Sequence, residues 1–317
     1  MNIGIVGSGK IVSELLGFIH TVKGINIAAI IGRKSSEEKV RAIAQKNNIP
    51  KVYFDYQEAL KDCDIEFMYI ALTNNLHFEY AKKALMAGKN VICEKPFTAS
   101  YLQARELSDI ARKNHLYLFE AITNQYVPNY LRIKESLKEL GNIKIVSCNY
   151  SQYSSRYDNF KKGIIQPAFD PVYCGGALYD INIYNIYFVI GLFSMPQSAK
   201  YFPNIERNVD TSGIAVLNYK DFQCVCIGSK DCDSPVGVTI QADNGYIFID
   251  GPASVCHHIV IDTKEGRREY TQDDTHRMAY EFMKFREIYE NSRYDIMIKN
   301  LDKSLEVMSV VDMLRNI

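Results

Sequence analysis

The sequence lacks the features that direct a chain to nucleic acid or to a membrane. Its 317 residues contain 37 Lys and Arg against 37 Asp and Glu, so the formal net charge is zero, and no long run of like charge occurs. A nucleic-acid-binding domain usually carries a basic face. A membrane-spanning helix needs about 20 consecutive apolar residues, and no apolar run comes near that length. We therefore expect neither nucleic acid nor a membrane as a partner.

Targeting and metal-binding patterns are also missing. The first residues lack a basic leader and a small-residue cleavage site, which favours a cytoplasmic protein. The eight cysteines form no C-x-x-C pair, and the histidines that follow Cys256 do not have the ligand spacing of a zinc site. We expect reduced thiols rather than disulfides, and no metal site.

Strand and helix patterns alternate through the first 120 residues, which predicts a doubly wound parallel sheet. A chain of this length usually forms two domains. We place the first domain, which contains this sheet, at residues 1–120. Its predicted strands are 3–6, 25–31, 52–54, 67–72, 91–93 and 116–120.

The pattern changes after residue 120. Helices are predicted at 129–140, 178–190, 278–291 and 301–315, with an irregular segment at 151–171. Strands are predicted at 143–150, 214–219, 222–228, 236–242, 246–250 and 258–262. Neighbouring strands joined by short turns predict an antiparallel sheet with a helix on one face. We assign 121–295 to a second α/β domain, and 296–317 to a separate C-terminal helical segment.

A glycine turn follows the first strand. Gly7-Ser8-Gly9-Lys10-Ile11 leads from strand to helix, as in the G-x-G-x-x-G motif that places a pyrophosphate at a helix N-terminus. Val12 occupies the third motif position, and an ordinary βα turn is the alternative. We favour a dinucleotide site.

The end of the second strand lacks the Asp or Glu that normally binds the ribose of NAD. Arg33 and Lys34 stand there instead, and cations suit the 2′-phosphate of NADP. The site therefore favours NADP over NAD. Ser36 is also expected to cap a helix that begins at Glu37, and both interpretations can hold.

The stretch from Gly88 to Phe97, GKNVICEKPF, is an apolar strand that ends in Glu94, Lys95 and Pro96. Ligands of open α/β sheets bind at the carboxyl ends of strands, which makes Lys95 a candidate for chemistry. A surface turn is the plain alternative. We expect a cis bond before Pro96, because cis is inexpensive only before proline.

These motifs occur in the order of a known family. Asn74-x-Leu76-His77 and then AGKxVxxEKP, from residue 87 to 96, follow the glycine turn, and GGALYD at 175–180 comes later. The chain resembles the glucose–fructose oxidoreductase and inositol dehydrogenase family (Gfo/Idh/MocA) over its whole length. The resemblance implies an oxidoreductase that uses NADP or NAD on a sugar-like alcohol or carbonyl. It also implies that residues 1–120 form a Rossmann dinucleotide-binding domain and that 121–295 bind the substrate. The second domain is then expected to contain a large open, mainly antiparallel sheet through which a homodimer or homotetramer forms, and 296–317 to pack back on the first domain.

The sequence departs from the family pattern at three places. Leu72-Thr73-Asn74 replaces the usual Thr-Pro-Asn, Val12 replaces a small residue, and Asp180-Ile181-Asn182-Ile183-Tyr184 lacks the frequent histidine. That run, together with Glu120-Ala121 and the residues 175–178, resembles the dimeric dihydrodiol dehydrogenase subgroup, whose members also oxidise D-xylose with NADP. Asn182 stands where that subgroup has glycine.

The resemblance, with the residues above, gives a set of candidate sites. The cofactor-binding candidates are Gly7, Gly9, Lys10, Ile11, Arg33, Lys34, Leu72, Asn74, His77, Glu94 and Lys95. The catalytic candidates are Lys95, Asp180 and Tyr184. The substrate-binding candidates are Lys95, Tyr157, Phe160, Asp180 and Tyr184. Glu94 receives no chemical role.

The catalytic candidates suit hydride transfer, which leaves an alkoxide in need of a proton and a nearby positive charge. Lys95 can supply the charge and Tyr184 the proton. Asp180 is four residues from Tyr184 and shares its helix face, where it can hold Lys95 or bind a substrate hydroxyl. Core packing of Tyr184 is the alternative, and His77 is expected to line the nicotinamide pocket.

The substrate itself is not identified by these residues. Tyr157, Phe160 and Phe169 suit a ring or the apolar face of a sugar, and Arg156 or Lys161 suits a charged group. Two other functions stay open: an NAD-dependent inositol or amino-sugar dehydrogenase, and a non-catalytic sensor that binds dinucleotide.

Overall fold

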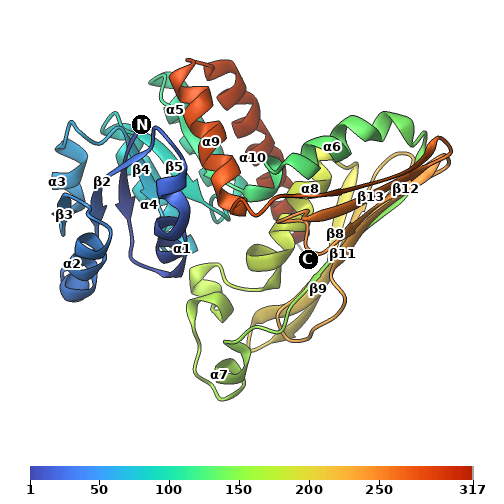
Figure 1. The fold of residues 1–317 in the computed structure, drawn as a ribbon. Helices are drawn as coiled ribbons and strands as arrows, with labels where there is room; N and C mark the ends of the chain where they lie inside the picture. Colours follow the sequence, from blue (N-terminus) through green and yellow to red (C-terminus); the bar gives the residue numbers. More distant parts are fainter. Residues whose placement is uncertain (316–317) are drawn as a thin grey trace. The chain divides into compact units, whose positions relative to one another are not determined.

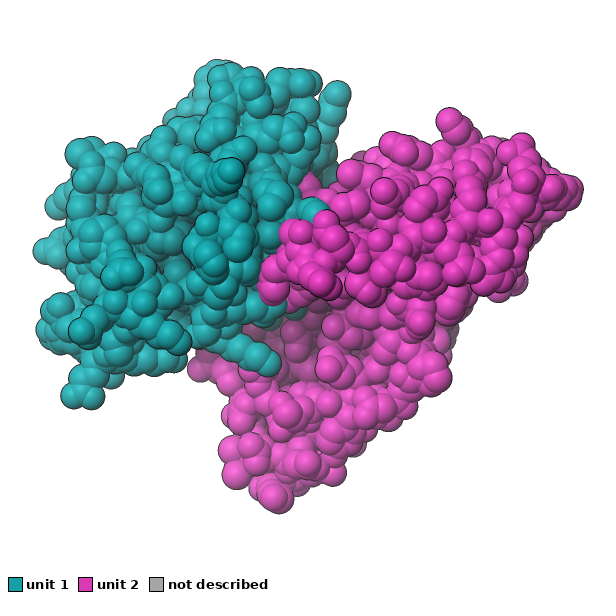
Figure 2. Space-filling model, viewed as in Figure 1, with its two compact units in different colours: residues 1–121, 278–305 teal, residues 122–277, 306–317 magenta. Residues whose placement is uncertain are grey.

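The computed structural model describes residues 1–315 of the chain, and residues 316 and 317 of the predicted closing segment lie outside the described residues. The chain divides into two compact units (Figures 1 and 2). Unit 1 consists of Met1–Ala121 and Met278–Leu305, and unit 2 of Ile122–Arg277 with the chain from Glu306 onward. The chain thus returns to unit 1 at residue 278, earlier than the expected residue 296. The division falls within the last helix.

Unit 1 contains the predicted doubly wound sheet. Its six strands lie in the order β3-β2-β1-β4-β5-β6, and every adjacent pair is parallel. The strands are β1 (Asn2–Val6), β2 (Asn26–Ile31), β3 (Lys51–Tyr53), β4 (Phe67–Ile70), β5 (Asn90–Glu94) and β6 (Leu118–Ala121). Each overlaps the strand expected at that place, because buried parallel strands produce continuous apolar runs that are easy to recognise.

The helices of unit 1 connect these strands. They are α1 (Lys10–Phe18), α2 (Glu37–Lys46), α3 (Tyr56–Lys61), α4 (His77–Met86) and α5 (Tyr101–Lys113), with short 3₁₀ turns η1 (Ile19–Thr21), η2 (Lys34–Ser36) and η3 (Asn74–Leu76). Two later helices, α9 (Arg277–Glu290) and α10 (Tyr294–Arg315), follow the second sheet in the chain. The ring of Phe285 on α9 stacks on Phe119 of β6 at 4.5 Å. Phe282 meets Tyr69 of β4 edge-on at 5.6 Å. This aromatic packing explains why α9 belongs to unit 1.

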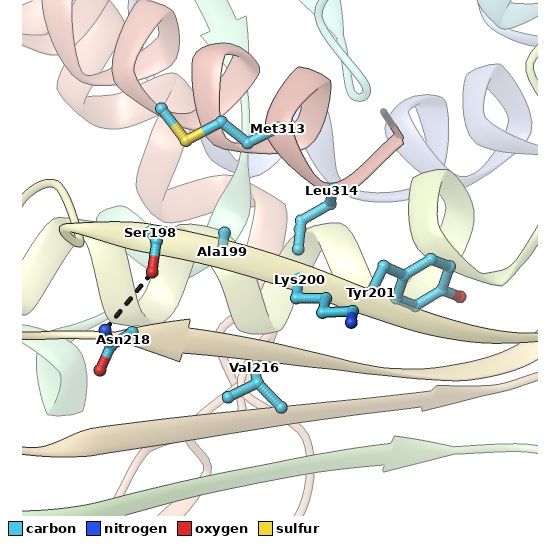
Figure 3. Close-up of a pocket in the computed structure, with 8 residues that line it drawn as sticks. All are labelled: Ser198, Ala199, Lys200, Tyr201, Val216, Asn218, Met313 and Leu314. Atoms are coloured by element: carbon cyan, nitrogen blue, oxygen red, sulfur yellow. Dashed lines mark hydrogen bonds between the residues drawn. The ribbon is translucent and has the colours of Figure 1, made fainter. Parts of the chain in front are cut away.

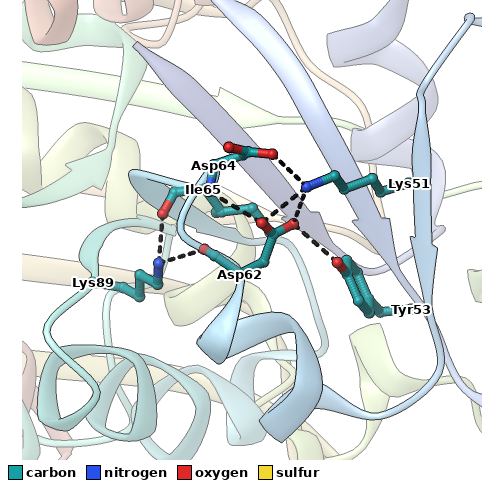
Figure 4. Close-up of polar contacts among 6 residues, drawn as sticks. All are labelled: Lys51, Tyr53, Asp62, Asp64, Ile65 and Lys89. Atoms are coloured by element: carbon teal, nitrogen blue, oxygen red, sulfur yellow. Dashed lines mark hydrogen bonds and ion pairs between the residues drawn. The ribbon is translucent and has the colours of Figure 1, made fainter.

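Two lysines fix the loop that leads into β4 (Figure 4). Lys51 Nζ lies 2.8 Å from a carboxylate oxygen of Asp62 and 2.6 Å from Asp64. Lys89 Nζ donates to the carbonyl oxygens of Asp62 at 2.6 Å and Ile65 at 2.8 Å. Burial acts to raise the pKa of Asp62, but the hydrogen bond from Lys51 and further donors outweigh it and lower that pKa.

The same loop places three possible metal ligands together, namely Asp62, Cys63 and Asp64. Lys51 already contacts both carboxylates, so its ammonium occupies the place where a cation would be attracted. We assign no metal site to this cluster.

Unit 2 is built on an eight-stranded sheet in the order β14-β13-β12-β11-β7-β10-β9-β8. Within the described part of this sheet only the β7–β10 pair is parallel, so the sheet is mainly antiparallel, as expected. The strands are β7 (Ile143–Ser151), β8 (Ser198–Glu206), β9 (Val209–Asn218), β10 (Gln223–Ser229), β11 (Gly237–Ala242), β12 (Gly245–Asp250), β13 (His258–Thr263) and β14 (Gly266–Thr271).

The two edge strands, β8 and β14, were not expected from the sequence. β8 is largely exposed and contains Pro203, and β14 reads GRREYT with charged side chains in solvent. Edge strands of natural sheets commonly carry proline and charge, which prevent pairing with other chains. Those same residues hide the alternation that marks a strand.

Helices cover one face of this sheet (Figure 1). They are α6 (Pro128–Ser136) and α8 (Ile183–Phe193), while α7 (Tyr157–Lys161) lies near one end of the strands. The short turns of unit 2 are η4 (Thr123–Gln125), η5 (Leu137–Glu139), η6 (Pro167–Phe169) and η7 (Pro171–Tyr173). The segment expected to be irregular therefore contains one short helix. The predicted helix 178–190 begins as a π-helical turn, η8 (Leu178–Asn182), before it continues as α8.

Helix α8 is the core helix of unit 2. Asn182 and Asn185 donate to the carbonyl oxygens of Cys226 at 3.0 Å and Ile227 at 2.9 Å on β10. By length and composition, Pro171–Phe193 could cross a membrane, but 83% of its most apolar window is buried inside the protein. Burial on this scale is typical of the core helix of a globular domain.

Candidate active site

The first glycine of the nucleotide motif is required by the fold. Gly7 has φ +125°, and a Cβ there would lie 2.4 Å from the carbonyl oxygen of Ala71. A positive φ combined with this close approach restricts the position to glycine. Gly7 thus makes the tight turn from β1 to α1.

The second glycine has no such structural reason. Gly9 is the N-cap of α1 with φ −81°, and a Cβ there would meet nothing within 4 Å. No side chain caps the helix, and its first turn contains no acidic residue. Open space beside uncapped N–H groups at a helix N-terminus fits a dinucleotide pyrophosphate. The first-turn residues are exposed Lys10 and half-buried Ile11, while Val12 is fully buried.

The two cations after β2 differ in their surroundings. Lys34 forms an ion pair with Glu37 at 2.6 Å, and its hydrogen bond is the first cause of the lowered pKa of Glu37. Arg33 is exposed, and its guanidinium contacts no acceptor among the described residues. Ser36 does precede α2, but its hydroxyl donates to the Arg33 carbonyl at 3.0 Å and does not cap the helix. Arg33 is therefore the cation available to a phosphate.

The turn that bears Lys95 is tied to buried His77. The Lys95–Pro96 bond is cis, as expected, and Lys95 is half-buried. His77 is fully buried, with Nδ1 2.9 Å from the carbonyl oxygen of Pro96 and Nε2 3.2 Å from that of Leu72. Burial lowers the pKa of His77, with a contribution from the charge of Lys95. The structure thus gives His77 the role of joining the turn after β4 to the turn after β5.

Glu94, a cofactor-binding candidate with no expected chemical role, is buried at the end of β5 and accepts a hydrogen bond from the hydroxyl of Tyr69. Burial raises the pKa of Tyr69 well above its ordinary value, so the phenol stays protonated as the donor. Leu72 and Asn74 are half-buried in the neighbouring turn after β4. Glu94 therefore fixes the strand end beside Lys95.

In unit 2, the glycine pair before Asp180 is explained by a buried carboxylate. Gly176 has φ +114°, and a Cβ there would lie 1.9 Å from Oδ1 of Asp210. Asp210 Oδ2 accepts the N–H of Leu178 at 2.7 Å and the hydroxyl of Tyr201 at 2.8 Å. Burial raises the pKa of Asp210. Asp210 on β9 therefore holds the start of the helix that carries Asp180.

Asp180 has an ion-pair partner that the sequence did not suggest. Lys230, which follows β10, places Nζ 2.9 Å from Oδ2 of Asp180. The expected partners were Lys95 or a substrate hydroxyl. Lys230 could have been found by the signal that identified Lys95, since it also follows the carboxyl end of an apolar strand.

Tyr184 lies on α8 with 9% of its surface exposed. Its ring is 6.1 Å from that of Tyr150, and its carbonyl oxygen accepts from Asn124 at 2.8 Å. Asp180 belongs to the π-helical turn and Tyr184 to the α-helix that follows, so their spacing does not run through a regular α-helix as assumed. Both belong to unit 2, whereas Lys95 belongs to unit 1.

The proposed substrate aromatics form a small core. Tyr157, Phe160, Phe169 and Val209 pack together, and Phe160 is completely buried. A ring with no exposed surface cannot contact a substrate, so the placement of Phe160 argues for a supporting role and against the substrate contact expected for it. Tyr157 is 8% exposed, and its hydroxyl donates to Glu206 at 2.7 Å.

A hollow of about 570 Å³ lies between the β8 edge and the end of α10 (Figure 3). It is lined by Ser198, Ala199, Lys200, Tyr201, Val216, Asn218, Met313 and Leu314. Lys200 is the single charged side chain of this lining, and the hydroxyl of Tyr201 is bound to Asp210. We assign no catalytic role to the hollow.

The doubly wound sheet and the glycine turn define a Rossmann-type dinucleotide-binding protein. Residues 1–122 match the model of the family described as "Oxidoreductase family, NAD-binding Rossmann fold" (GFO_IDH_MocA). The chain is 30% identical over 312 residues to the Bacillus subtilis scyllo-inositol 2-dehydrogenase (NADP(+)) IolU, covering 97% of this chain and 94% of that protein. The protein therefore belongs to the Gfo/Idh/MocA family, which confirms the expected family and enzyme class.

Other relatives and solved structures agree with this assignment. The chain is 30% identical to trans-1,2-dihydrobenzene-1,2-diol dehydrogenase of Xenopus tropicalis, over 83% of this chain and 79% of that protein. KijD10, a 3-ketoreductase from Actinomadura kijaniata in complex with TDP-benzene and NADP, shares the fold with a TM-score of 0.84. It is 19% identical, over 100% of this chain and 97% of that one.

Proposed function

We propose that this protein is an NADP-dependent dehydrogenase or reductase acting on a hydroxyl or carbonyl group of a neutral polyol, such as a cyclitol, a sugar or a cyclic diol. The observation that carries the proposal is Lys95, half-buried at the carboxyl end of β5 on a turn that His77 and Glu94 hold from two sides. Ligands of doubly wound sheets bind at this end of the strands.

The proposed roles follow from the side chains. When bound, the nicotinamide supplies or accepts the hydride. Lys95 provides positive charge for the oxygen that becomes an alkoxide, and Tyr184 exchanges the proton with that oxygen. Asp180 accepts a hydrogen bond from a substrate hydroxyl and so orients the substrate. In the oxidative direction the carbinol carbon loses a hydride and its hydroxyl loses a proton, which leaves the carbonyl.

The preference for NADP is supported by Arg33, whose exposed guanidinium is positioned after β2 without a protein acceptor among the described residues. A guanidinium binds phosphate through two parallel hydrogen bonds. The Bacillus subtilis relative carries NADP(+) in its name, which agrees with this preference.

The substrate class is supported by the relatives. Their names refer to scyllo-inositol and to a trans-dihydrobenzene diol, and both are rings bearing neighbouring hydroxyl groups. The test is a titration with NADPH and NADH, followed by turnover assays with inositols, aldoses, cyclic diols and amino sugars. Tight NADPH binding with turnover of a neutral polyol is the expected result. Tight binding without turnover of any of these compounds would favour a dinucleotide sensor.

We also propose that two or four copies assemble through the open face of the unit 2 sheet. Apolar side chains on this face are unusually exposed for a sheet: Ile145 47%, Phe202 52%, Ile214 42%, Tyr246 37% and Phe248 37%. Phe202 and Ile214 lie directly opposite each other on β8 and β9. Large exposed apolar patches mark interaction surfaces.

The eight free cysteines support a reducing, cytoplasmic location.

A further inference from the structure

Lys230 is a buried lysine that the proposed reaction does not use directly. Its side chain is 1% exposed. Besides the ion pair with Asp180, Nζ donates to the carbonyl oxygen of Ala168 and lies 4.2 Å from the ring centre of Phe169. An ammonium group is strongly disfavoured in the protein interior unless it is paired. Burying Lys230 here therefore calls for a functional reason as well as for partners.

The other carboxylates near Lys230 are bound by other donors. Asp210 accepts from the Leu178 N–H and the Tyr201 hydroxyl. Asp231, the next residue in the chain, accepts hydroxyl hydrogen bonds from Thr211 at 2.6 Å and Ser212 at 2.9 Å. The charge of Lys230 also acts on Asp210, whose pKa it helps to lower against the effect of burial, but its ammonium forms its ion pair with Asp180.

The two members of the pair differ in exposure. Asp180 keeps 35% of its side chain exposed, whereas Lys230 keeps 1%. A molecule in solvent can therefore contact the carboxylate of Asp180, whereas the ammonium group of Lys230 is not accessible to it. Lys230 can therefore influence a substrate only through Asp180.

We propose that Lys230 is the positioning residue of Asp180 and that the pair selects a neutral hydroxyl over an ammonium group. This inference rests on the proposed function. Lys230 holds one carboxylate oxygen of Asp180 in a fixed direction through the ion pair at 2.9 Å. Asp180 then accepts a hydrogen bond from substrate.

The pair also has no net charge. An unbalanced carboxylate would attract the ammonium group of an amino sugar, whereas a carboxylate already neutralised at 2.9 Å offers such a group little extra attraction. The pair therefore bears on the choice between neutral and amino-bearing substrates, which the sequence left open. It favours a neutral cyclitol or sugar and disfavours an amino-sugar substrate.

The experiment is a double-mutant cycle with Lys230→Met, Asp180→Asn and the double variant. Each is assayed with the neutral polyol that the wild type turns over best and with its amino analogue, and NADPH affinity is measured by fluorescence titration. Lys89→Met is the matched control. Lys89 also donates to backbone carbonyl oxygens, but these belong to the loop before β4 in unit 1.

We expect each single variant to lower kcat/KM by about 30-fold or more, the range of a lost charge-assisted hydrogen bond. The double variant should be no worse than Asp180→Asn alone, because Lys230 acts through Asp180. Lys230→Met should raise the ratio of amino to neutral substrate by about tenfold. NADPH affinity should stay within about twofold, and Lys89→Met should keep wild-type kinetics.

Two outcomes would overturn the inference: wild-type kcat/KM in Lys230→Met, or losses that multiply in the double variant. If Lys230→Met fails to fold, the double variant replaces it, since removing both members of a buried pair is tolerated better than removing one. Its kcat/KM must then equal that of Asp180→Asn, and a further tenfold loss would refute the role. A wild type inactive on all polyols would overturn the proposed function and this role together, whereas an active wild type with additive variants would overturn this role alone.

Discussion

The carbonyl oxygen of Pro96 lies 2.9 Å from Nδ1 of His77, a histidine with no exposed surface. The other ring nitrogen faces the carbonyl oxygen of Leu72 at 3.2 Å. A single buried ring thus holds two strand-end turns of unit 1, including the one that carries Lys95. The sequence predicted that His77 lines the nicotinamide pocket, and this stays a prediction. The structure adds that its ring joins the two turns.

The buried ring predicts a pH-dependent stability. Burial lowers the pKa of His77, so below about pH 6.5 the unfolded chain takes up a proton that the folded chain does not. The stabilisation by neutral His77 is complete above that pH and is lost progressively as the pH falls. Thermal unfolding of the wild type should weaken between pH 7.5 and 5.5 more than that of His77→Gln. Identical pH slopes in the two proteins would contradict this role.

The two glycines of the nucleotide turn should respond differently to alanine. Gly7→Ala should destabilise the fold by about 2 kcal/mol or more, because it combines a positive φ with a backbone clash. Gly9→Ala should cost at most about 1 kcal/mol, the loss expected at an N-cap, yet weaken NADPH binding by about tenfold or more. Thermal unfolding and cofactor titration measure both effects. Equal destabilisation by the two variants would show that Gly9 is structural.

Cofactor choice should depend on Arg33. Arg33→Ala should weaken NADPH by about 10- to 100-fold, the value of hydrogen bonds to a charged group, and leave NADH almost unchanged. Lys34→Ala is the control, because Lys34 is already paired with Glu37. Titration of both cofactors decides the question. A similar loss for NADPH and NADH would exclude a contact with the 2′-phosphate.

The catalytic proposal predicts severe losses in two variants that leave cofactor binding intact. Lys95→Ala should lower kcat by about 10²- to 10³-fold through loss of charge stabilisation. Tyr184→Phe should lower it by about 10²- to 10⁴-fold through loss of proton transfer. Steady-state kinetics with the neutral polyol, together with NADPH titration, provide the measurement. Turnover close to wild type in both variants would return these residues to structural roles.

If the copies assemble through the open face of the unit 2 sheet, a charged residue introduced on that face should dissociate the oligomer. Phe202→Asp should dissociate the oligomer, because it places a charge on a face whose burial would hold the copies together. Met86→Asp is the control: Met86 is 70% exposed on α4 of unit 1. Light scattering after size-exclusion chromatography reports the mass. A wild-type protein that runs as a monomer would refute assembly through this face.

The local pattern of apolar and polar residues was sufficient to predict most of the helices and strands. The buried parallel strands of unit 1, the glycine turn and the lysine turn were all found from apolar runs and the residues that end them. The edge strands β8 and β14 were not found, because proline and charge replace the usual alternation there. The sequence predicted a regular α-helix from residue 178, whereas the first five residues form a π-helical turn. Five residues are too few for the sequence pattern to distinguish the two kinds of helix.

The candidate site likewise contains features that the sequence predicted and contacts that only the structure revealed. The sequence by itself determined the nucleotide turn, Arg33, and the placement of Lys95 at a strand end, because each depends on neighbours in the chain. Only the tertiary structure decided that Asp210 binds the N–H of Leu178 and leaves no room for a side chain at Gly176, and that Lys230 pairs with Asp180. These contacts join segments far apart in sequence, and the burial that makes a charged pair informative exists only once the sheet and its helix have packed together.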